Sequence, residues 1–471
     1  MVLLVGLKHQ STKRGNIDVW HRSLCGNRGP EPWMKFSHLV VDFPLRWRQA
    51  ENVIPRHVAT RLRKALSDRP VVLLQGARQS GKTTLARTLA ENDYPAHYVT
   101  LDGLTALAAA RSDPEGFLAG LEGPVVIDEV QRAPELFLAT KAEVDRARRP
   151  GRFLLTGSAN VLLPTLAEML VGRMEVVTLW PFSQGEMDGT CDSFVDAVFD
   201  DGPPAPERLG AATPLLERLL RGGYPEATIA DSPARRGAWF DRYLATLLAR
   251  DVRDLARIEG LADLPRLLAL IAARPMSVLN LAELARTSRL RDTTLKRYFA
   301  LLEAVFLVRT IPPWHGNLGK RLVKTPKVLL TDSGLAAHLM GLDATRLERD
   351  RSLLGGLLEG FVAMEIVKQL GWSQAAPALL HFRTHAGHEV DLVLERRSGE
   401  VVGIEVKSAA SVTAADLQGL RALETATGPR FHRGVVLYTG REVIPFGPRL
   451  HAVPLEALWS CSSRVDRGRT A

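Results

Sequence analysis

A glycine-rich loop follows directly on a short apolar run, and few folds accommodate that combination. The run is Val71-Val72-Leu73-Leu74, and the loop is Gly76-Ala77-Arg78-Gln79-Ser80-Gly81-Lys82-Thr83. When a buried strand turns into a helix through such a loop, successive backbone N–H groups point inward and form a nest for the α- and β-phosphates of a nucleotide. The sequence therefore predicts a strand, loop and helix that bind a nucleoside triphosphate.

The loop assigns roles to individual side chains. Lys82 is expected to reach the β- and γ-phosphates, and Thr83 is expected to ligate Mg²⁺. A glycine-rich surface turn is the alternative, which the preceding apolar strand disfavours. ATP and Mg²⁺ are the expected ligands, and the residues expected to contact the nucleotide are Gly76, Ala77, Arg78, Gln79, Ser80, Gly81, Lys82, Thr83 and Thr84.

A second apolar strand ends in two adjacent acids, Asp128 and Glu129. Magnesium bound with a nucleotide needs a carboxylate at the end of a neighbouring strand, and Asp128 is expected to hold it directly or through water. Glu129 is expected to polarise the water that attacks the γ-phosphate. Without the glycine-rich loop, the same pair would be an ordinary strand-end turn.

A third strand and the segment after it supply two further candidates. Residues 152–160 end in small polar residues, of which Ser158, and less favourably Asn160, is expected to hydrogen-bond the γ-phosphate or the attacking water. Arg173 is a candidate to bring positive charge to the transition state, either in cis or across a subunit boundary. The alternative for Arg173 is a surface or ion-pair residue.

With these motifs in place, the chain resembles AAA-type ATPases. More narrowly, it resembles a widespread prokaryotic group of predicted ATPases whose C-terminal region carries a domain of unknown function. The resemblance covers roughly residues 50–445 and implies ATP chemistry, but it implies no substrate. The motifs that carry it are Gly81-Lys82-Thr83-Thr84, Ile127-Asp128-Glu129-Val130-Gln131, Leu155-Thr156-Gly157-Ser158, Val171-Gly172-Arg173, Trp180-Pro181-Phe182-Ser183-Gln184-Gly185-Glu186 and Gly222-Gly223-Tyr224-Pro225-Glu226.

Composition narrows the class of protein. The chain has 471 residues, 46% hydrophobic and 24% charged, which is the balance of a soluble globular protein with two to four domains. No apolar run approaches the roughly 20 residues that cross a bilayer, and the three cysteines are widely separated, so we expect a cytoplasmic protein without membrane contact. The net charge of +9 makes a DNA or RNA partner plausible, although solvated helix faces are the alternative.

The chain is expected to contain several α/β and helical segments. Strands that alternate with helices predict a parallel α/β sheet in the ATPase core. Met34 lies just before the first interpretable segment, so a start of translation at Met34 is one of two alternatives for residues 1–33. The expected segments are 1–45, an extension either disordered or untranslated; 46–210, the P-loop ATPase core; 211–260, a helical lid or linker; 261–345, a winged-helix-like module; 346–458, a restriction-endonuclease-like α/β domain; and 459–471, a disordered tail.

The middle of the chain predicts three helices followed by a hairpin, which is the order of a winged helix. Its third helix carries Arg291, Lys296 and Arg297, a set suited to phosphate contacts and the major groove of DNA. The alternative is a packing lid or a subunit contact. A homo-oligomer and a complex with another protein both remain open.

The last third of the chain contains Asp391 and, about a dozen residues later, Glu405-x-Lys407. On paired antiparallel strands, residues 405 and 407 point to the same face, where they can meet Asp391. The two carboxylates can bind Mg²⁺ beside a phosphodiester, and the lysine can orient the attacking water. Upstream, Glu359 is the preferred further acid and Glu365 the second choice.

This arrangement resembles the PD-(D/E)xK restriction-endonuclease-like fold over about residues 353–440. The resemblance implies that Glu359, Asp391, Glu405 and Lys407 form a nuclease centre. The alternative is an ion pair within an inert module. Three functions follow as hypotheses: an ATP-powered DNA-processing or defence enzyme, a nucleotide-controlled regulatory or scaffold protein, and, least favoured, a small-molecule kinase.

Overall fold

The computed structural model describes residues 53–158, 170–207, 209, 210, 213–252, 263–317, 319, 321 and 325–463. The chain divides into a unit of residues 1–53 and a unit of residues 54–471. The expectations for residues 1–45, for Asn160 and for the end of the C-terminal tail lie outside the described residues.

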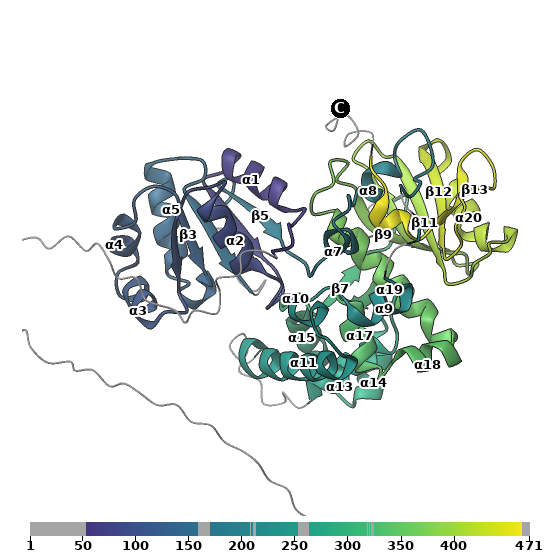
Figure 1. The fold of residues 1–471 in the computed structure, drawn as a ribbon, viewed down its shortest axis with the longest axis horizontal. Coiled ribbons are helices and arrows are strands. Elements are labelled where there is room, and N and C mark those ends of the chain that lie inside the picture. The colour runs from purple at the N-terminus through teal and green to yellow at the C-terminus, as the bar shows by residue number, and fades with distance from the viewer. Residues whose placement is uncertain are drawn as a thin grey trace, which may run out of the picture. The chain divides into compact units, whose positions relative to one another are not determined.

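A parallel five-stranded sheet forms the first part of the second unit. Figure 1 shows this sheet with helices packed beside it. Its order is β2-β3-β4-β1-β5, and every neighbouring pair is parallel. The parallel α/β sheet predicted for the ATPase core is therefore confirmed. The strands are β1 (Val71–Gln75), β2 (His97–Thr100), β3 (Val125–Asp128), β4 (Phe153–Gly157) and β5 (Met174–Thr178).

Successive side chains of a strand point to opposite faces of the sheet. Both faces of this sheet are apolar, and helices cover both of them. In β1, Val71 and Leu73 belong to one apolar cluster, whereas Val72 and Leu74 belong to the other. Both clusters are buried, which explains why the strands are continuously apolar. The helices of this part are α1 (Ala59–Asp68), α2 (Lys82–Glu91), α3 (Leu104–Ser112), α4 (Pro114–Ala119), the short 3₁₀ helix η2 (Val130–Arg132) and α5 (Leu136–Arg146).

A largely helical region follows. It begins with α7 (Gln184–Asp188), α8 (Phe194–Ala197), α9 (Leu215–Arg221), α10 (Pro225–Thr228), α11 (Pro233–Thr246) and the π-helical turn η4 (Leu247–Val252). Three helices then pack with a small antiparallel sheet of order β6-β8-β7. These elements are α13 (Asp263–Ala272), β6 (Ser277–Val278), α14 (Leu281–Ser288), α15 (Asp292–Ala304), β7 (Val308–Ile311) and β8 (Lys327–Leu330).

A second, separate sheet forms the C-terminal part, with the order β13-β14-β12-β11-β10-β9. Strand β10 pairs antiparallel with β9 and β11, whereas β12 lies parallel to β11 and β14. Its strands are β9 (Ala378–Arg383), β10 (Glu389–Glu395), β11 (Val401–Lys407), β12 (Phe431–Tyr438), β13 (Ile444–Pro445) and β14 (Leu450–Pro454). Its helices are α17 (Ser333–Leu339), α18 (Ala344–Arg349), α19 (Ser352–Gln369), η5 (Ala414–Leu417), α20 (Gln418–Thr427), η6 (Gly428–Arg430) and α21 (Ala457–Ser460).

A bulge in β10 turns Asp391 toward α19. The register between β10 and β9 shifts between Val390 and Val393, and both valines belong to the apolar cluster that contains α20. Leu392, between them, belongs instead to the cluster that contains α19. Bulges of this kind re-aim side chains and are frequent beside functional sites.

Two expected domain limits differ from the structure. The predicted tail starts at residue 459, but Trp459 lies in α21 and is only 3% exposed, so the folded part continues beyond that point. The predicted ATPase core reaches residue 210. However, Asp196 in α8 accepts hydrogen bonds from Ser373 Oγ (2.6 Å) and Ala375 N (2.8 Å) of the C-terminal part. The chain leaves the first fold soon after β5, and sequence spacing alone does not reveal this crossing.

Candidate functional site

The glycine-rich loop lies between β1 and α2, at the carboxyl edge of the parallel sheet. Gly76 has φ of +154°, and a Cβ atom there would lie 2.1 Å from the carbonyl oxygen of Leu179. Glycine is therefore the residue that fits this turn. The Lys82 side chain is buried and donates hydrogen bonds to Gly76 O (3.0 Å) and Ala77 O (2.9 Å). The ammonium group thus lies over the loop whose amides are expected to receive phosphate.

Asp128 lies at the end of β3, next to the first turn of α2. Its carboxylate accepts hydrogen bonds from Thr83 Oγ1 at 3.1 Å, from Tyr98 Oη at 2.8 Å and from Thr156 Oγ1. Burial, followed by the charge of Asp128, raises the pKa of the Tyr98 hydroxyl, which keeps it a donor. The hydroxyl of Thr83 and the carboxylate of Asp128 are hard oxygen ligands at adjacent positions, so the residues present fit Mg²⁺.

Glu129 forms a second polar group beside Asp128. Its backbone is left-handed (φ 59°, ψ 45°), and its amide donates to Thr156 Oγ1 at 3.0 Å. Its carboxylate accepts from Ser158 Oγ at 3.3 Å and from Gln131 Nε2. A left-handed non-glycine residue costs free energy, and such strain gathers at functional sites. The structure therefore brings Glu129 and Ser158 together, with Gln131 as an additional partner that the sequence motifs leave without a role.

Arg173 lies at the opposite edge of the sheet. It precedes β5, and its backbone carbonyl accepts from Val71 N, at the start of β1, at 3.2 Å. The phosphate loop follows the other end of β1, about 16 Å away for five extended residues. The guanidinium of Arg173 pairs with the carboxylate of Asp145 at 2.5 Å. The starts and the ends of the strands in a parallel sheet lie on opposite edges. The prediction that Arg173 acts on the nucleotide of its own chain is therefore wrong for this arrangement. Its action across a subunit boundary stays a prediction.

Arg56 is a contact of the phosphate loop that no sequence motif identifies. Its guanidinium donates to Ser80 O (2.9 Å), to Trp180 O (2.6 Å) and to Glu186 Oε1 (3.1 Å). It also lies over the ring of Phe182, with 4.7 Å to the ring centroid. Arg56 therefore connects the loop to residues 180–186, the segment that follows β5.

The same segment is bonded to α19. Lys368 Nζ donates to Phe182 O at 2.9 Å, and Glu365 Oε2 accepts from Gln184 N at 2.9 Å. Lys368 and Glu365 also form a buried ion pair of 2.6 Å. Glu365, the second choice for the nuclease-like site, is thus occupied by this connection. A continuous set of bonds runs from the phosphate loop to the helix that carries Glu359.

The candidate residues of the C-terminal part come together around Asp391. Lys407 Nζ bonds Glu405 Oε1 at 3.2 Å. Burial, then the charge of Asp391, raises the pKa of Glu405 to about 8 and that of Glu359 to about 7. Asp391 Oδ2 accepts from Val406 N at 3.0 Å. Two carboxyls thus hold protons near neutral pH because they share a buried space with Asp391.

Two charged residues that the sequence motifs do not reveal complete this cluster. Lys327, from β8, pairs with Glu389 Oε1 at 2.5 Å and with Asp391 Oδ1 at 3.4 Å. Burial alone would lower the pKa of Lys327, but the charges of Asp391, Glu389 and Glu359 raise it. Glu389 lies two residues before Asp391, within the segment that carries the predicted site, whereas Lys327 gives no local signal. In the part of the chain that the structure describes, no three His, Cys, Asp or Glu side chains are arranged to hold a metal ion.

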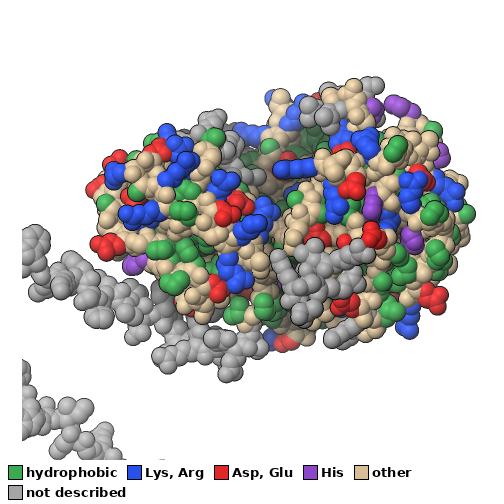
Figure 2. All heavy atoms as spheres, turned by 90° about the horizontal axis from the view of Figure 1, so that it is seen from above, with side chains coloured by type: hydrophobic (Ala, Val, Ile, Leu, Met, Phe, Trp, Pro, Cys, Tyr) green, Lys and Arg blue, Asp and Glu red, His purple; other side chains and the backbone are tan. Residues whose placement is uncertain are grey.

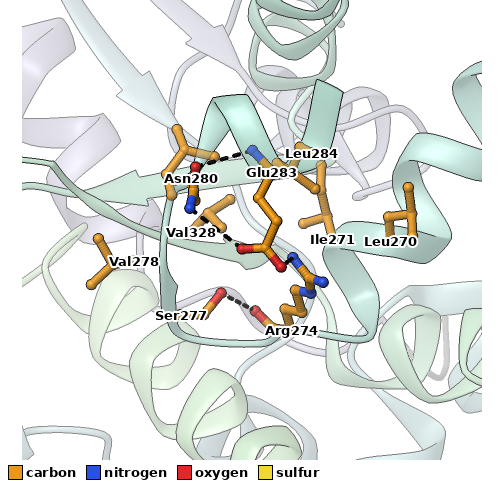
Figure 3. A pocket seen from close by; sticks show the side chains of 10 residues that line it. Leu270, Ile271, Arg274, Ser277, Val278, Asn280, Glu283, Leu284 and Val328 are labelled. Carbon is orange, nitrogen blue, oxygen red and sulfur yellow. Dashed lines mark hydrogen bonds and ion pairs between the residues drawn. The ribbon is translucent and has the colours of Figure 1, made fainter. Parts of the chain in front are cut away.

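Two of the hollows among the described residues lie in the middle module, which comprises α13, β6, α14, α15, β7 and β8. One, of about 240 Å³, lies between α13 and α14, and Figure 3 shows its polar side chains bonded to one another, with Arg274 paired to Glu283 at 2.7 Å. The other is wide and open, about 700 Å³, and is lined by Arg286, Arg289 and Arg291 at the turn between α14 and α15. The second hollow adjoins the exposed helix face predicted to contact phosphates.

Comparisons with known proteins divide the chain in a similar way. Residues 68–188 match the model of an AAA domain. Residues 213–346 and 354–458 match two domains of unknown function, DUF8612 and DUF4143. These matches support an ATP-binding and ATP-hydrolysing AAA protein and leave the role of the C-terminal module without support.

Two mycobacterial proteins and one solved structure are similar to the chain. The uncharacterized proteins Rv2008c of Mycobacterium tuberculosis and Mb2031c of Mycobacterium bovis are each 36% identical over 413 residues, which is 87% of this chain and 85% of each relative. The Walker-type ATPase PABY2304 of Pyrococcus abyssi is 15% identical and covers 62% of this chain and 97% of its own, with a TM-score of 0.38.

No helix among the described residues is long and apolar enough to span a bilayer.

Proposed function

The chain belongs to the family of Rv2008c and Mb2031c, and within it we propose a Mg²⁺-dependent ATPase whose nucleotide state controls its C-terminal domain. The observation that carries the ATPase part is the arrangement at the carboxyl edge of the sheet. There, Thr83 bonds Asp128, and Glu129 bonds Ser158, beside the loop that Lys82 covers. This is the set of groups that ATP hydrolysis needs: a phosphate nest, oxygen ligands and a base.

Each residue then has a defined task. Lys82 would exchange its two carbonyl contacts for phosphate oxygens. Thr83 and Asp128 would hold Mg²⁺, which would neutralise charge at the phosphates. Glu129 accepts a proton from the attacking water, and Ser158 with Gln131 orients that carboxylate. The nucleotide is bound by the segment Gly76 to Thr84.

Control of the C-terminal domain is proposed from the bonds that link the two parts. Arg56 contacts the phosphate loop through Ser80 and contacts residues 180–186, which in turn contact α19. A change of the loop on binding or losing the γ-phosphate would therefore alter the position of the helix that carries Glu359.

For the C-terminal domain, we propose a nuclease-like site that processes nucleic acid, formed by Glu359, Asp391, Glu405 and Lys407. The gathering of these four residues on β10, β11 and α19 supports this role. The alternative, a regulatory or scaffold protein with an inert C-terminal domain, is supported by the ion pairs that already occupy the acids.

We also propose that α13, α14, α15 and the β7–β8 hairpin form a winged helix that contacts DNA. Arg291, Lys296 and Arg297 are exposed on or next to α15, and the arginine-lined hollow lies beside them. Figure 2 shows Lys and Arg interspersed with Asp and Glu on the face displayed, so this local group, and not the overall charge, favours contact with DNA.

The test of the proposed function is phosphate release from ATP by the purified protein with and without Mg²⁺, and with and without DNA or RNA. We expect Mg²⁺-dependent release in the wild type and none in Lys82→Ala. Release by Lys82→Ala at the wild-type rate would refute the ATPase assignment. In parallel, Mn²⁺- or Mg²⁺-dependent strand cleavage that disappears in Lys407→Ala would support the nuclease-like role, and its absence on every substrate would favour the inert domain.

A further inference from the structure

The acidic cluster of the C-terminal part already contains a positive charge from another part of the chain. The Lys327 side chain is 1% exposed and lies 2.5 Å from Glu389 Oε1 and 3.4 Å from Asp391 Oδ1. An ammonium group is buried to this degree only when carboxylates compensate for its lost hydration. Lys327 is therefore the buried cation among those of this cluster. The others among the described residues are Lys407, which pairs with Glu405 at 3.2 Å, and Arg383, which lies 4.0 Å from Glu389.

The hairpin that carries Lys327 is fixed to the edge of the C-terminal sheet. Trp314 N donates to His381 O at 2.5 Å, and His381 N donates to Pro312 O at 3.0 Å, so the end of β7 continues onto β9. On the other arm, Thr325 O lies 3.3 Å from His381 Nε2. Both arms of the hairpin therefore contact His381 of β9, and these contacts hold Lys327 of β8 beside the acidic cluster.

The contacts of Asp391 leave little for a metal ion. Its Oδ1 faces Lys327 and its Oδ2 accepts from the amide of Val406. A divalent cation bound to Asp391 would lie next to the Lys327 ammonium, which is 3.4 Å from Oδ1. The repulsion between these positive charges disfavours a divalent cation while Lys327 is in place. Removing the ammonium would release Asp391 and Glu389 from these ion pairs and leave less positive charge beside them.

We propose that Lys327 is a built-in occupant of the cation site, which keeps divalent cations out of the nuclease-like centre while its ion pairs with Glu389 and Asp391 persist. This inference rests on the proposed nuclease-like function, because it names the regulation of that same site. The ligand that Lys327 excludes is a divalent cation with hard oxygen preference, Mg²⁺ or Mn²⁺. Replacement of the singly charged ammonium by a doubly charged cation would then attract the carboxylates of Glu389 and Asp391 more strongly.

The experiment measures Mn²⁺ binding to the nucleotide-free full chain by the loss of the free-ion EPR signal. The variants are Lys327→Met, which keeps the apolar stem, and Lys64→Met, a control at an exposed lysine of α1. We expect Lys327→Met to bind Mn²⁺ at least about tenfold more tightly than the wild type and the control. A further Asp391→Asn change should abolish the gain, which assigns the metal to this cluster and not to Asp128.

Two measurements separate this inference from the nuclease-like function. If Lys327→Met gains Mn²⁺ binding and also cleaves nucleic acid, both proposals hold; if it gains binding without cleavage, the occupant role holds and the nuclease-like function fails. If the variant is folded by thermal unfolding but binds Mn²⁺ no better than the wild type, the occupant role is refuted. Should Lys327→Met fail to fold, Lys327→Gln, which removes the charge but keeps a hydrogen-bond donor beside Glu389 and Asp391, takes its place with the same two readings.

Discussion

Replacing Glu129 by Gln isolates the proposed base from the rest of the nucleotide site. Gln has the same shape, and its remaining oxygen can still accept from Ser158 Oγ, which lies 3.3 Å from Glu129 Oε2. Lys82 and Thr83 make their hydrogen bonds to Gly76, Ala77 and Asp128, not to Glu129. ATP binding should therefore persist while proton transfer is lost.

The magnitude follows from what a positioned base contributes. General base catalysis is worth about 10²- to 10⁴-fold, so kcat should fall by that factor, which corresponds to about 3 to 5 kcal/mol in the activation barrier. The dissociation constant of ATP should stay within about threefold of the wild-type value. A tenfold change would require a loss of about 1.4 kcal/mol in binding free energy, which the retained contacts of Lys82 and Thr83 do not predict. Glu122→Gln, the same chemical change at an exposed residue before β3, should leave both values unchanged.

The assay combines single-turnover phosphate release with equilibrium binding of a fluorescent ATP analogue in the presence of Mg²⁺. Turnover of Glu129→Gln above about half the wild-type rate would show that Glu129 is not the base. Loss of nucleotide binding together with turnover would show that the residue acts on the fold of the loop instead.

Three further outcomes are expected. Arg56→Ala should lower the free energy of unfolding by about 3 kcal/mol, because it leaves buried Glu186 without its ion pair, and urea unfolding measures this. Gly76→Ala should abolish ATP binding in a protein that still folds, because the added Cβ meets Leu179 O at 2.1 Å; wild-type affinity would contradict the loop geometry. The pKa of Glu405 is raised from 4.5 to about 8, so between these pH values the folded state binds more protons than the unfolded state. The free energy of unfolding should therefore fall as pH rises from about 5 to 8. If Glu405→Gln shows the same pH dependence, Glu405 is not the cause of it.

The sequence identifies the parts of the site that lie in contiguous motifs. The loop at Gly76, the acids after β3 and Ser158 lie together because parallel strands present their carboxyl ends at one edge, and applying that rule requires only the order of strands and loops along the chain. The same rule excludes Arg173 from this edge. Because Arg173 precedes its strand, it lies at the other edge, beside the start of β1.

Tertiary partners cannot be found in this way. Arg56 and Glu186 are 130 positions apart, and Lys327 and Asp391 are 64 positions apart, so no periodicity or spacing relates them. The crossing of α8 to the C-terminal part is equally invisible in local composition. These contacts arise from packing of distant segments, and they are the ones on which the coupling and the closed cation site depend.

The central claim, that the nucleotide state controls the C-terminal domain, is tested most directly by hydrogen exchange on Glu129→Gln with and without MgATP. The contacts of Arg56, Phe182 and Lys368 predict that nucleotide changes amide protection in residues 180–186 and in α19, as well as in the phosphate loop. Changes confined to the loop and the parallel sheet would contradict the account.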